Sequence, residues 1–330
     1  MKKLICLFLG LAVVLSLAAG CDRTLGPEIE TTKLVSDEER NQAAGQLGDL
    51  DDAAKQALDD MLARGVTLPA EELPVQPMAP PMPTGVQARP EDVYPLMEKV
   101  RNILSSDTYM FKARGSAPPS AGMPMGTTPV TFAVDKGKSA FEADMDWTNM
   151  MRAMAEPGTQ EYNMARINGA TMATLFGRKV RFVSRPDGDL VLFVDKKTYV
   201  QIPAGEGENG EGVLSMGSMF GEVFSPKKSA GDVQASKVTD NGKEYLCATI
   251  KGEGGVTMRY YFLVSEDSPL KRIEMDAPNP ETGKNEVIVF EIDMLTDKVD
   301  AAMFSSAGFS VMPFDQMLGE AGGLGTMFGG

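Results

Sequence analysis

From residue 108 onward, short segments of alternating apolar and polar residues are separated by turn-forming groups, and this pattern limits the fold more than any other feature. Alternation with a period of two places one face of a strand in a core and the other towards solvent. Asp135-Lys136-Gly137, Pro186-Asp187-Gly188 and Asn241-Gly242 are turn signals between neighbouring antiparallel strands. The predicted strands cover residues 108–114, 130–135, 139–146, 179–184, 189–195, 198–202, 233–239, 243–251, 256–264, 270–276 and 286–294. The sequence therefore predicts an α+β protein built on a curved antiparallel sheet, a half-open barrel.

Three segments have helical spacing instead. Residues 91–104 form an amphipathic helix before the first strand, and residues 146–155 and 213–224 are helical inserts between strands. The inserts carry apolar, methionine-rich faces, and their candidate ligand-binding residues are Trp147, Met150, Met151, Met154, Met216, Phe220 and Phe224. These faces either close the open side of the sheet as core, or line a cavity for apolar ligands, which the adaptable methionine side chain suits.

The first 20 residues have the three parts of an export signal: two lysines, an apolar stretch over residues 4–17 and small residues before Cys21. This arrangement resembles the lipobox of bacterial lipoproteins, although Ala18 stands where leucine is usual. The resemblance implies that Cys21 is acylated, becomes the new N-terminus and anchors the chain on the extracytoplasmic side of a membrane. An ordinary secretory signal and a transmembrane helix are the alternatives, but the apolar stretch is short for a membrane span.

The region between the signal and the strands divides by composition. Ser36 and Glu39 have the spacing of a capping box, which predicts that an acidic helix begins here. That helix is either a solvated spacer, a partner-binding helix or a helix docked on the domain. The predicted organisation is a signal peptide (1–20), a tether (21–35), an acidic helix (36–65), a proline-rich linker (66–90), the sheet domain (91–311) and a flexible Gly/Met-rich tail (312–330).

Charge and residue usage exclude several classes of function. The net charge is −14, and −16 once residues 1–20 with their two lysines are removed, which disfavours nucleic acid as a partner. The chain has no histidine, so a Ser-His-Asp triad and a histidine-based metal site are excluded. Cys247 is the one cysteine of the folded part, and its strand-like surroundings favour a small buried side chain over a reactive thiol. Glu142, Asp144 and Asp146 share one strand face, which indicates a solvated face rather than a calcium or catalytic site.

The order of elements resembles the LolA/LolB-like group of lipoprotein carriers and receptors over residues 91–311. The hairpin at 130–138, the Asp187-Gly188 hairpin running to Tyr199, and the closing segments 270–274 and 299–304 carry this resemblance. It implies a curved antiparallel sheet whose concave face is covered by helices, and lipids or lipoprotein acyl chains as the ligand class. The long inserts and the N-terminal helix depart from the small carriers, and no functional residue of the group can be placed on this chain.

The leading hypothesis is therefore a non-enzymatic, lipid-anchored envelope protein that binds apolar ligands and uses no cofactor or metal. Its expected partners are the membrane, through lipidated Cys21, and a lipid or lipoprotein ligand. A structural or sensory lipoprotein that acts through protein–protein contacts is the alternative. A hydrolase with paired carboxylates is a third reading, which would require two acids close together in a cleft.

Overall fold

The computed structural model describes residues 36–45, 47, 50, 52–63, 65–68, 80, 82–116, 128–152, 158–202, 233–252, 255–266, 269–278 and 285–313. The predicted signal peptide and Cys21 lie outside these ranges. So do the helix predicted at 213–224, with Met216, Phe220 and Phe224, and also Met154 and most of the predicted tail. In the part of the chain that is described, no helix is both long and apolar enough to span a bilayer.

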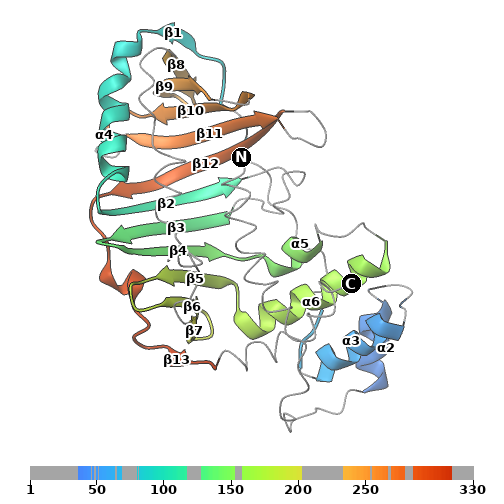
Figure 1. Cartoon of the computed structure of the whole chain (residues 1–330). Coiled ribbons are helices and arrows are strands. Elements are labelled where there is room, and N and C mark those ends of the chain that lie inside the picture. Colours follow the sequence, from blue (N-terminus) through green and yellow to red (C-terminus); the bar gives the residue numbers. More distant parts are fainter. Residues whose placement is uncertain are drawn as a thin grey trace.

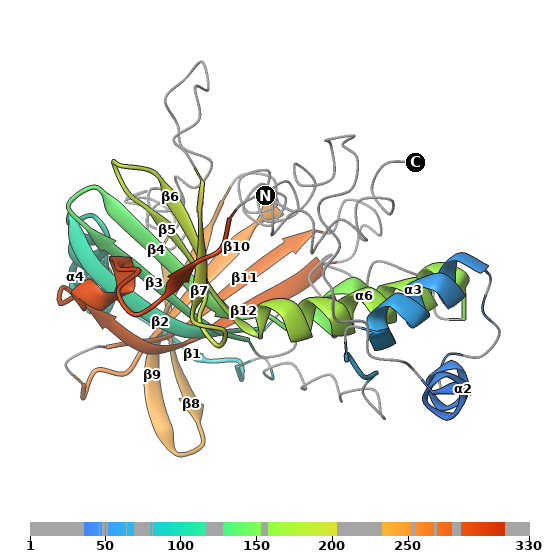
Figure 2. The ribbon, with the colours of Figure 1, turned by 90° about the horizontal axis from the view of Figure 1, so that it is seen from below.

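The described strands form one sheet of 13 strands that curves but does not close (Figures 1 and 2). The strands are β1 (Val86–Ala88), β2 (Thr108–Ser116), β3 (Thr128–Asp135), β4 (Lys138–Asp144), β5 (Lys179–Ser184), β6 (Asp189–Phe193), β7 (Thr198–Ile202), β8 (Val233–Asp240), β9 (Lys243–Lys251), β10 (Thr257–Phe262), β11 (Leu270–Pro278), β12 (Asn285–Thr296) and β13 (Ser310–Val311). Their order is β1-β8-β9-β10-β11-β12-β2-β3-β4-β5-β6-β7-β13. The predicted α+β class, with a curved antiparallel sheet that stays open, is confirmed.

Two antiparallel meanders, β2–β7 and β8–β12, are joined where β12 pairs with β2. Only β13 is parallel to its neighbour, β7, among the described pairs. The predicted hairpin turns are present: Lys136 and Gly137 have φ of 47° and 84°, and Asn241 and Gly242 have φ of 48° and 75°. Positive φ at both central residues is the geometry of the tight turn that fits the twist of a hairpin.

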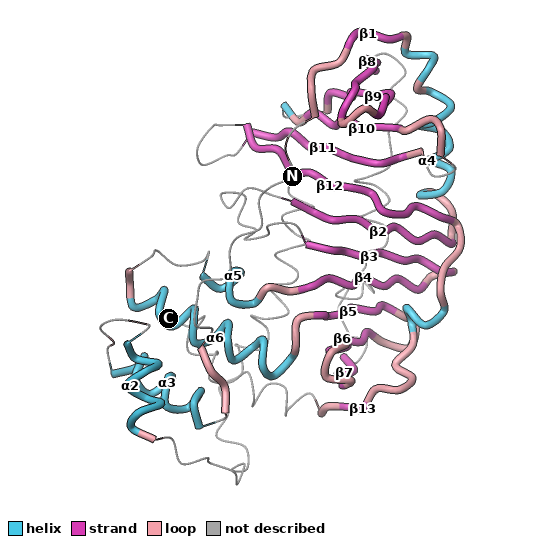
Figure 3. Tube along the Cα trace, turned by 180° about the vertical axis from the view of Figure 1, so that it is seen from behind, coloured by secondary structure: helices cyan, strands magenta, loops and turns pink. Residues whose placement is uncertain are grey.

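The described helices are α2 (Asp37–Gly45), α3 (Asp52–Ala63), η1 (Pro90–Asp92), α4 (Tyr94–Leu104), α5 (Trp147–Arg152), α6 (Gln160–Phe176) and η4 (Ala301–Phe304). The helix predicted at 91–104 is thus a short 3-10 turn followed by α4. Figures 1 and 3 show α4 beside the ends of β10, β11 and β12. It buries Met97, Val100 and Leu104 in the main core, together with its N-cap residue Val93.

The acidic helix predicted at 36–65 needs correction, because it is two helices. Its capping box is confirmed: Ser36 Oγ accepts the N–H of Glu39 at 3.2 Å, and the Glu39 carboxylate accepts the N–H of Ser36 at 3.1 Å. The break falls after Gly45, where a glycine lowers helix propensity. Arg40 and Asp59 join the two helices through an ion pair of 2.6 Å.

Three elements were not predicted. β1 lies inside the proline-rich linker predicted at 66–90, which therefore extends too far; a three-residue strand shows no periodicity and exists through its pairing with β8. β13 is shorter still, with two residues. The third is α6, which lacks a single apolar stripe because it is buried on several sides. Its Gly169 packs so closely on α5 that a Cβ there would lie 2.6 Å from Thr148 Cα.

Candidate ligand-binding face

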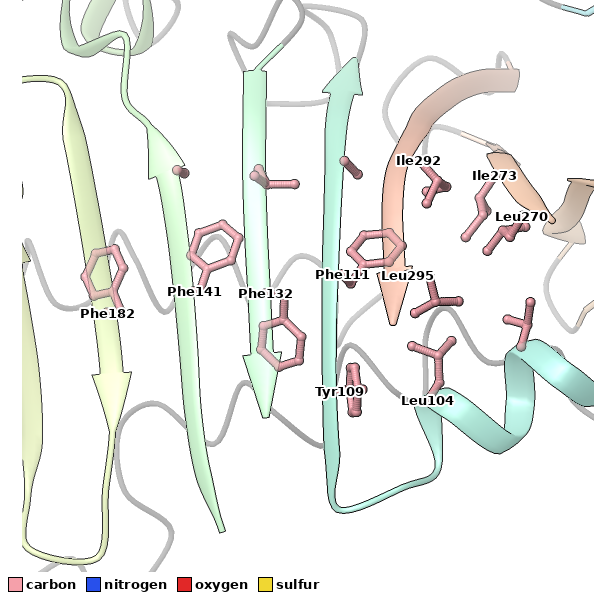
Figure 4. Packing of buried hydrophobic residues seen from close by; sticks show 14 of the residues in the cluster. Leu104, Tyr109, Phe111, Phe132, Phe141, Phe182, Leu270, Ile273, Ile292 and Leu295 are labelled. Carbon is pink, nitrogen blue, oxygen red and sulfur yellow. The ribbon is translucent and has the colours of Figure 1, made fainter. Parts of the chain in front are cut away.

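One face of the sheet carries a row of phenylalanines on four adjacent strands. Phe111 of β2 lies directly opposite Phe132 of β3, Phe132 opposite Phe141 of β4, and Phe141 opposite Phe182 of β5. Side chains at directly opposite positions contact one another across a sheet. We call these four residues the phenylalanine row and this side of the sheet the phenylalanine face (Figure 4).

The row continues with apolar residues in both directions. Leu295 of β12 is opposite Phe111, and on the other side Val191 of β6 and Val200 of β7 extend the row beyond Phe182. Neighbouring strands lie about 4.8 Å apart, so the part of the row from β2 to β7 is about 24 Å long. The result is an uninterrupted apolar line across the strands, in a sheet whose two edges do not meet.

A row of small side chains runs beside the phenylalanine row. Ala113, Val130, Ala143 and Val180 lie opposite one another in the same four strands, two residues along each strand from the phenylalanines. Both rows face the same way because side chains alternate along a strand. The small row fills less volume than the phenylalanine row, so the face is uneven across its width.

The phenylalanine row is buried in the present structure. Phe132 is 1% exposed and Phe141, the most exposed of the four, is 7% exposed. Tyr109 packs against Phe132 with ring centroids 5.8 Å apart, and burial raises the pKa of its phenol well above the ordinary value. The face is therefore dry and aromatic, and it offers packing and apolar contact rather than acid–base chemistry.

The structure places two of the predicted site residues where their side chains can be described. Trp147 is buried in the same cluster as the phenylalanine row, and its Nε1–H donates to the Gly177 carbonyl at 2.6 Å. Met151 is buried as well. Met150 lies in α5 but its side chain is outside the description, and Met154, Met216, Phe220 and Phe224 lie outside the described residues.

The junction between α6 and β5 holds the edge of this face in place. Asp195 accepts the backbone N–H groups of Arg178 at 2.8 Å and Lys179 at 2.9 Å, and these bonds lower the pKa of its carboxyl. Gly177 has φ of 72°, and a Cβ there would lie 2.7 Å from the Asp195 Cβ. The tight junction lets Phe176 at the end of α6 stack on Phe193 of β6, with centroids 4.5 Å apart.

The phenylalanine row itself was missed by sequence reasoning, although part of it was accessible. The Lys136-Gly137 turn pairs Asp135 with Lys138. Three residues further from the turn on each strand, Phe132 lies opposite Phe141. The pairs with Phe111 and Phe182 depend on longer connections, whose lengths do not set a register.

The acidic row of β4 lies on the opposite face and is occupied by cross-strand ion pairs. Glu142 is 2.6 Å from Arg181, and Asp144 is 3.1 Å from Arg178. Glu142 and Arg181 are largely buried, so the prediction of a solvated face is wrong at Glu142; the arginine on the next strand replaces water as its partner. Within the described ranges, no group of three or more acidic or cysteine side chains is placed to hold a metal ion.

Cys247 is buried, at 2% exposed, which agrees with the reading of a small core residue. Burial raises the pKa of its thiol, and hydrogen bonds from its neighbours offset this only in part. A thiol with a raised pKa stays protonated at neutral pH and is a poor nucleophile.

No family model matches the sequence, and no curated protein is similar to it. Solved structures that are similar include LprF from Mycobacterium bovis, with 9% identity, 62% of this chain and 95% of that chain covered, and a TM-score of 0.32. The Mycobacterium tuberculosis lipoprotein LppX has 10% identity, covers 63% and 98%, and has a TM-score of 0.31. A LolA superfamily protein from Nitrosomonas europaea has 12% identity, covers 64% and 96%, and has a TM-score of 0.23. These likenesses concern the fold alone.

Proposed function

We propose that this protein is an extracytoplasmic, lipid-anchored binding protein for apolar ligands, with acyl chains of lipids or lipoproteins as the ligand class. The ligand packs against the phenylalanine face, and the protein has no catalytic role. Cys21 carries the anchor. The observation that supports the proposal most directly is the register-aligned phenylalanine row in a sheet that does not close.

The geometry of the face suits a long, flexible apolar ligand. An acyl chain that lies across the strands meets a ring or a branched side chain on each strand from β2 to β7. Each methylene group removed from water contributes about 0.8 kcal/mol, so a handful of them is enough for micromolar binding before ordering costs. The methionine-rich segments predicted to be helical would adapt to chains of different shape.

The test is native mass spectrometry of the full chain carrying Cys21→Ser, exported by a bacterial host and purified without detergent, followed by lipid extraction. We expect a discrete added mass that extracts as lipid. A chain that is free of added mass and also fails to bind a fluorescent fatty acid would rule out the binding function.

A matched pair of variants locates the ligand. Ala143 faces the phenylalanine side and Ala140, in the same strand, faces the other side, and both are buried. Overpacking either site costs about 1–3 kcal/mol of stability, so both variants should lose thermal stability to a similar degree. Ala143→Phe should lose the bound lipid, whereas Ala140→Phe should keep it.

The anchor is tested separately by metabolic labelling with palmitate. Wild-type protein should carry label and partition with membranes, and Cys21→Ala should do neither. Labelled wild type with no lipid in its sheet would support the anchor and contradict the binding function.

A structural or sensory lipoprotein is the second candidate, and one observation favours it. All four residues of the phenylalanine row are at most 7% exposed, as in a filled core. Under this function, lipid-free protein would be fully stable and a fatty acid would not raise its Tm. The arginine partners of Glu142 and Asp144 give a hydrolase no comparable support.

A further inference from the structure

The segment before the main domain contacts the rest of the molecule at two separate places. α3 lies against α6, which projects beyond the sheet, and α2 packs on α3 (Figure 2). Pro80 and Met82 contact β11, and β1 follows at the far edge of the sheet. Figure 1 shows α3 and β1 at opposite ends of the molecule. The two contacts differ in their chemistry.

The contact at Pro80 and Met82 is built on a buried ion pair. Arg272 and Glu274 have side chains that are 9% and 4% exposed, and they lie 2.8 Å apart. Arg272 donates to the Pro80 carbonyl, and Glu274 accepts the N–H of Met82 at 3.2 Å. We call these two side chains the clamp. They bind the chain backbone on both sides of Pro81, which has no N–H of its own.

Neighbouring groups complete the clamp. Tyr261 donates its hydroxyl hydrogen to Glu274 at 2.9 Å, and Met82 packs against the cluster of Val238, Cys247 and Tyr261. Releasing the segment would take hydrogen-bond partners from two buried charged side chains, which is unfavourable. The clamp therefore fixes residue 80 to the sheet as long as the sheet is folded.

The contact of α2 and α3 with α6 has a different composition. Its cluster contains Ile167 and Ala170 from α6, with Met164 beside them. Its other buried members belong to the helix pair and the residues after it: Ala43, Leu47, Leu58, Met61, Leu62, Val66 and Leu68. The Arg40–Asp59 ion pair is also internal to the helix pair. The helix pair and the residues after it supply seven of the nine buried members of this cluster, and they add no strand to the sheet.

We propose that the helix pair is a releasable latch, so that the connection between anchor and domain has two lengths. The inference rests on the proposed lipid anchor at Cys21. When the latch is closed, Asp37 lies 16 residues after Cys21, and this stretch spans at most about 55 Å. When it is open, the connection runs 59 residues to Pro80 at the clamp, with a limit of about 200 Å if the helices unfold.

The two lengths serve different steps of ligand binding. The closed latch holds the domain close to the membrane that contains the anchor, where acyl ligands are taken up. The open latch lets the sheet, still fixed at the clamp, reach a distant acceptor without leaving its membrane.

The test measures two distances between pairs of spin labels in the full-length chain that carries Cys21→Ser. One pair, Gln56→Cys with Thr174→Cys, joins exposed sites on α3 and α6, and the control pair, Gln87→Cys with Thr174→Cys, joins β1 to α6. Trp147 is the one tryptophan of the chain and is buried beside the sheet, so its fluorescence reports unfolding of the sheet. Urea should broaden and lengthen the Gln56 distance well before Trp147 fluorescence changes, while the Gln87 distance stays narrow.

A charge placed in the contact should open the latch without urea. Ile167→Asp places the charge on the α6 side of the contact, and Leu58→Asp places it on the α3 side. If Ile167→Asp unfolds α6, Leu58→Asp provides the test of the latch. Val86→Asp, at a residue that is 76% exposed, is the control and should leave both distances unchanged.

The latch is refuted if the Gln56 distance and Trp147 fluorescence change together in urea, or if Leu58→Asp leaves the Gln56 distance narrow. Palmitate labelling of wild type reports on the anchor independently, so failure of the anchor and of the latch are distinguishable.

Discussion

The two faces of the sheet are made by the same strands but hold different chemistry. The phenylalanine face presents Phe132, Phe141 and their neighbours in aligned apolar rows. The opposite face holds ion pairs that fasten other segments: Arg181 with Glu142 beside η4, and Arg272 with Glu274 at the clamp. Alternation along each strand thus separates apolar surface from fastening points without a second layer of sheet.

The same separation applies to the small clusters. On the opposite face, Met303 and Phe304 of η4 cover Ala133, Ala140 and Val183. Small residues there leave room for a segment to lie flat, whereas the phenylalanine face projects rings. Substitutions on the phenylalanine face are therefore expected to alter packing and ligand content, and those on the opposite face are expected to release segments.

The largest effect is expected from truncating the phenylalanine row. Phe132→Ala should lower the free energy of unfolding by about 3–5 kcal/mol, because it removes buried apolar contact and leaves a cavity. The measurement is urea denaturation followed by Trp147 fluorescence. Phe132→Leu, which keeps most of the volume, should cost much less; equal losses would show that ring packing is not the source of stability.

A comparable but slightly smaller effect is expected at the clamp. Glu274→Gln should destabilise the sheet by about 3 kcal/mol, because it leaves Arg272 buried without a charged partner. Hydrogen exchange should also show loss of protection in β1 while the phenylalanine row strands stay protected. If protection were lost uniformly, the clamp would be part of the general core and not a fastening point.

The ion pair beside η4 should contribute less. Arg181→Met removes both the pair with Glu142 and the 2.9 Å hydrogen bond to the Ala302 carbonyl, and about 1.5 kcal/mol of stability should be lost. A double-mutant cycle with Glu142→Met separates the two contributions. A coupling energy near zero would assign the whole loss to the bond with η4.

The smallest effect is a pH dependence at Asp195. Its pKa is lowered in the folded state by the backbone N–H groups of Lys179 and Arg178, so its contribution is fully present above the unfolded pKa of about 3.9. The contribution is lost as the pH falls through the lowered folded value. Wild type should therefore exceed Asp195→Asn in Tm at pH 7, and the difference should shrink below about pH 4. A difference that stays constant with pH would point to shape rather than charge.

Much of the sheet could be predicted because alternation and turn residues are local signals. β5, β7 and β9 begin and end at the predicted residues. α6 was missed because its Gly169 and its polar residues, Asn163 and Asn168, are buried by neighbours that only the folded chain brings together. Half of the phenylalanine row depends on pairings across long connections, and no local pattern encodes them.

The pairing of β12 with β2 determines how the molecule must assemble. Met110 pairs with Thr296, so the seam between the two meanders closes a loop of nearly the whole domain. Each meander consists of contacts between strands that are close in sequence and can form quickly, whereas the seam is slow because loop closure must come first. During folding, β2 therefore remains an open edge until the last strands arrive, and Leu295 does not yet cover Phe111. The time between synthesis of β2 and arrival of β12 is the period in which this chain is most prone to aggregate and most dependent on a chaperone.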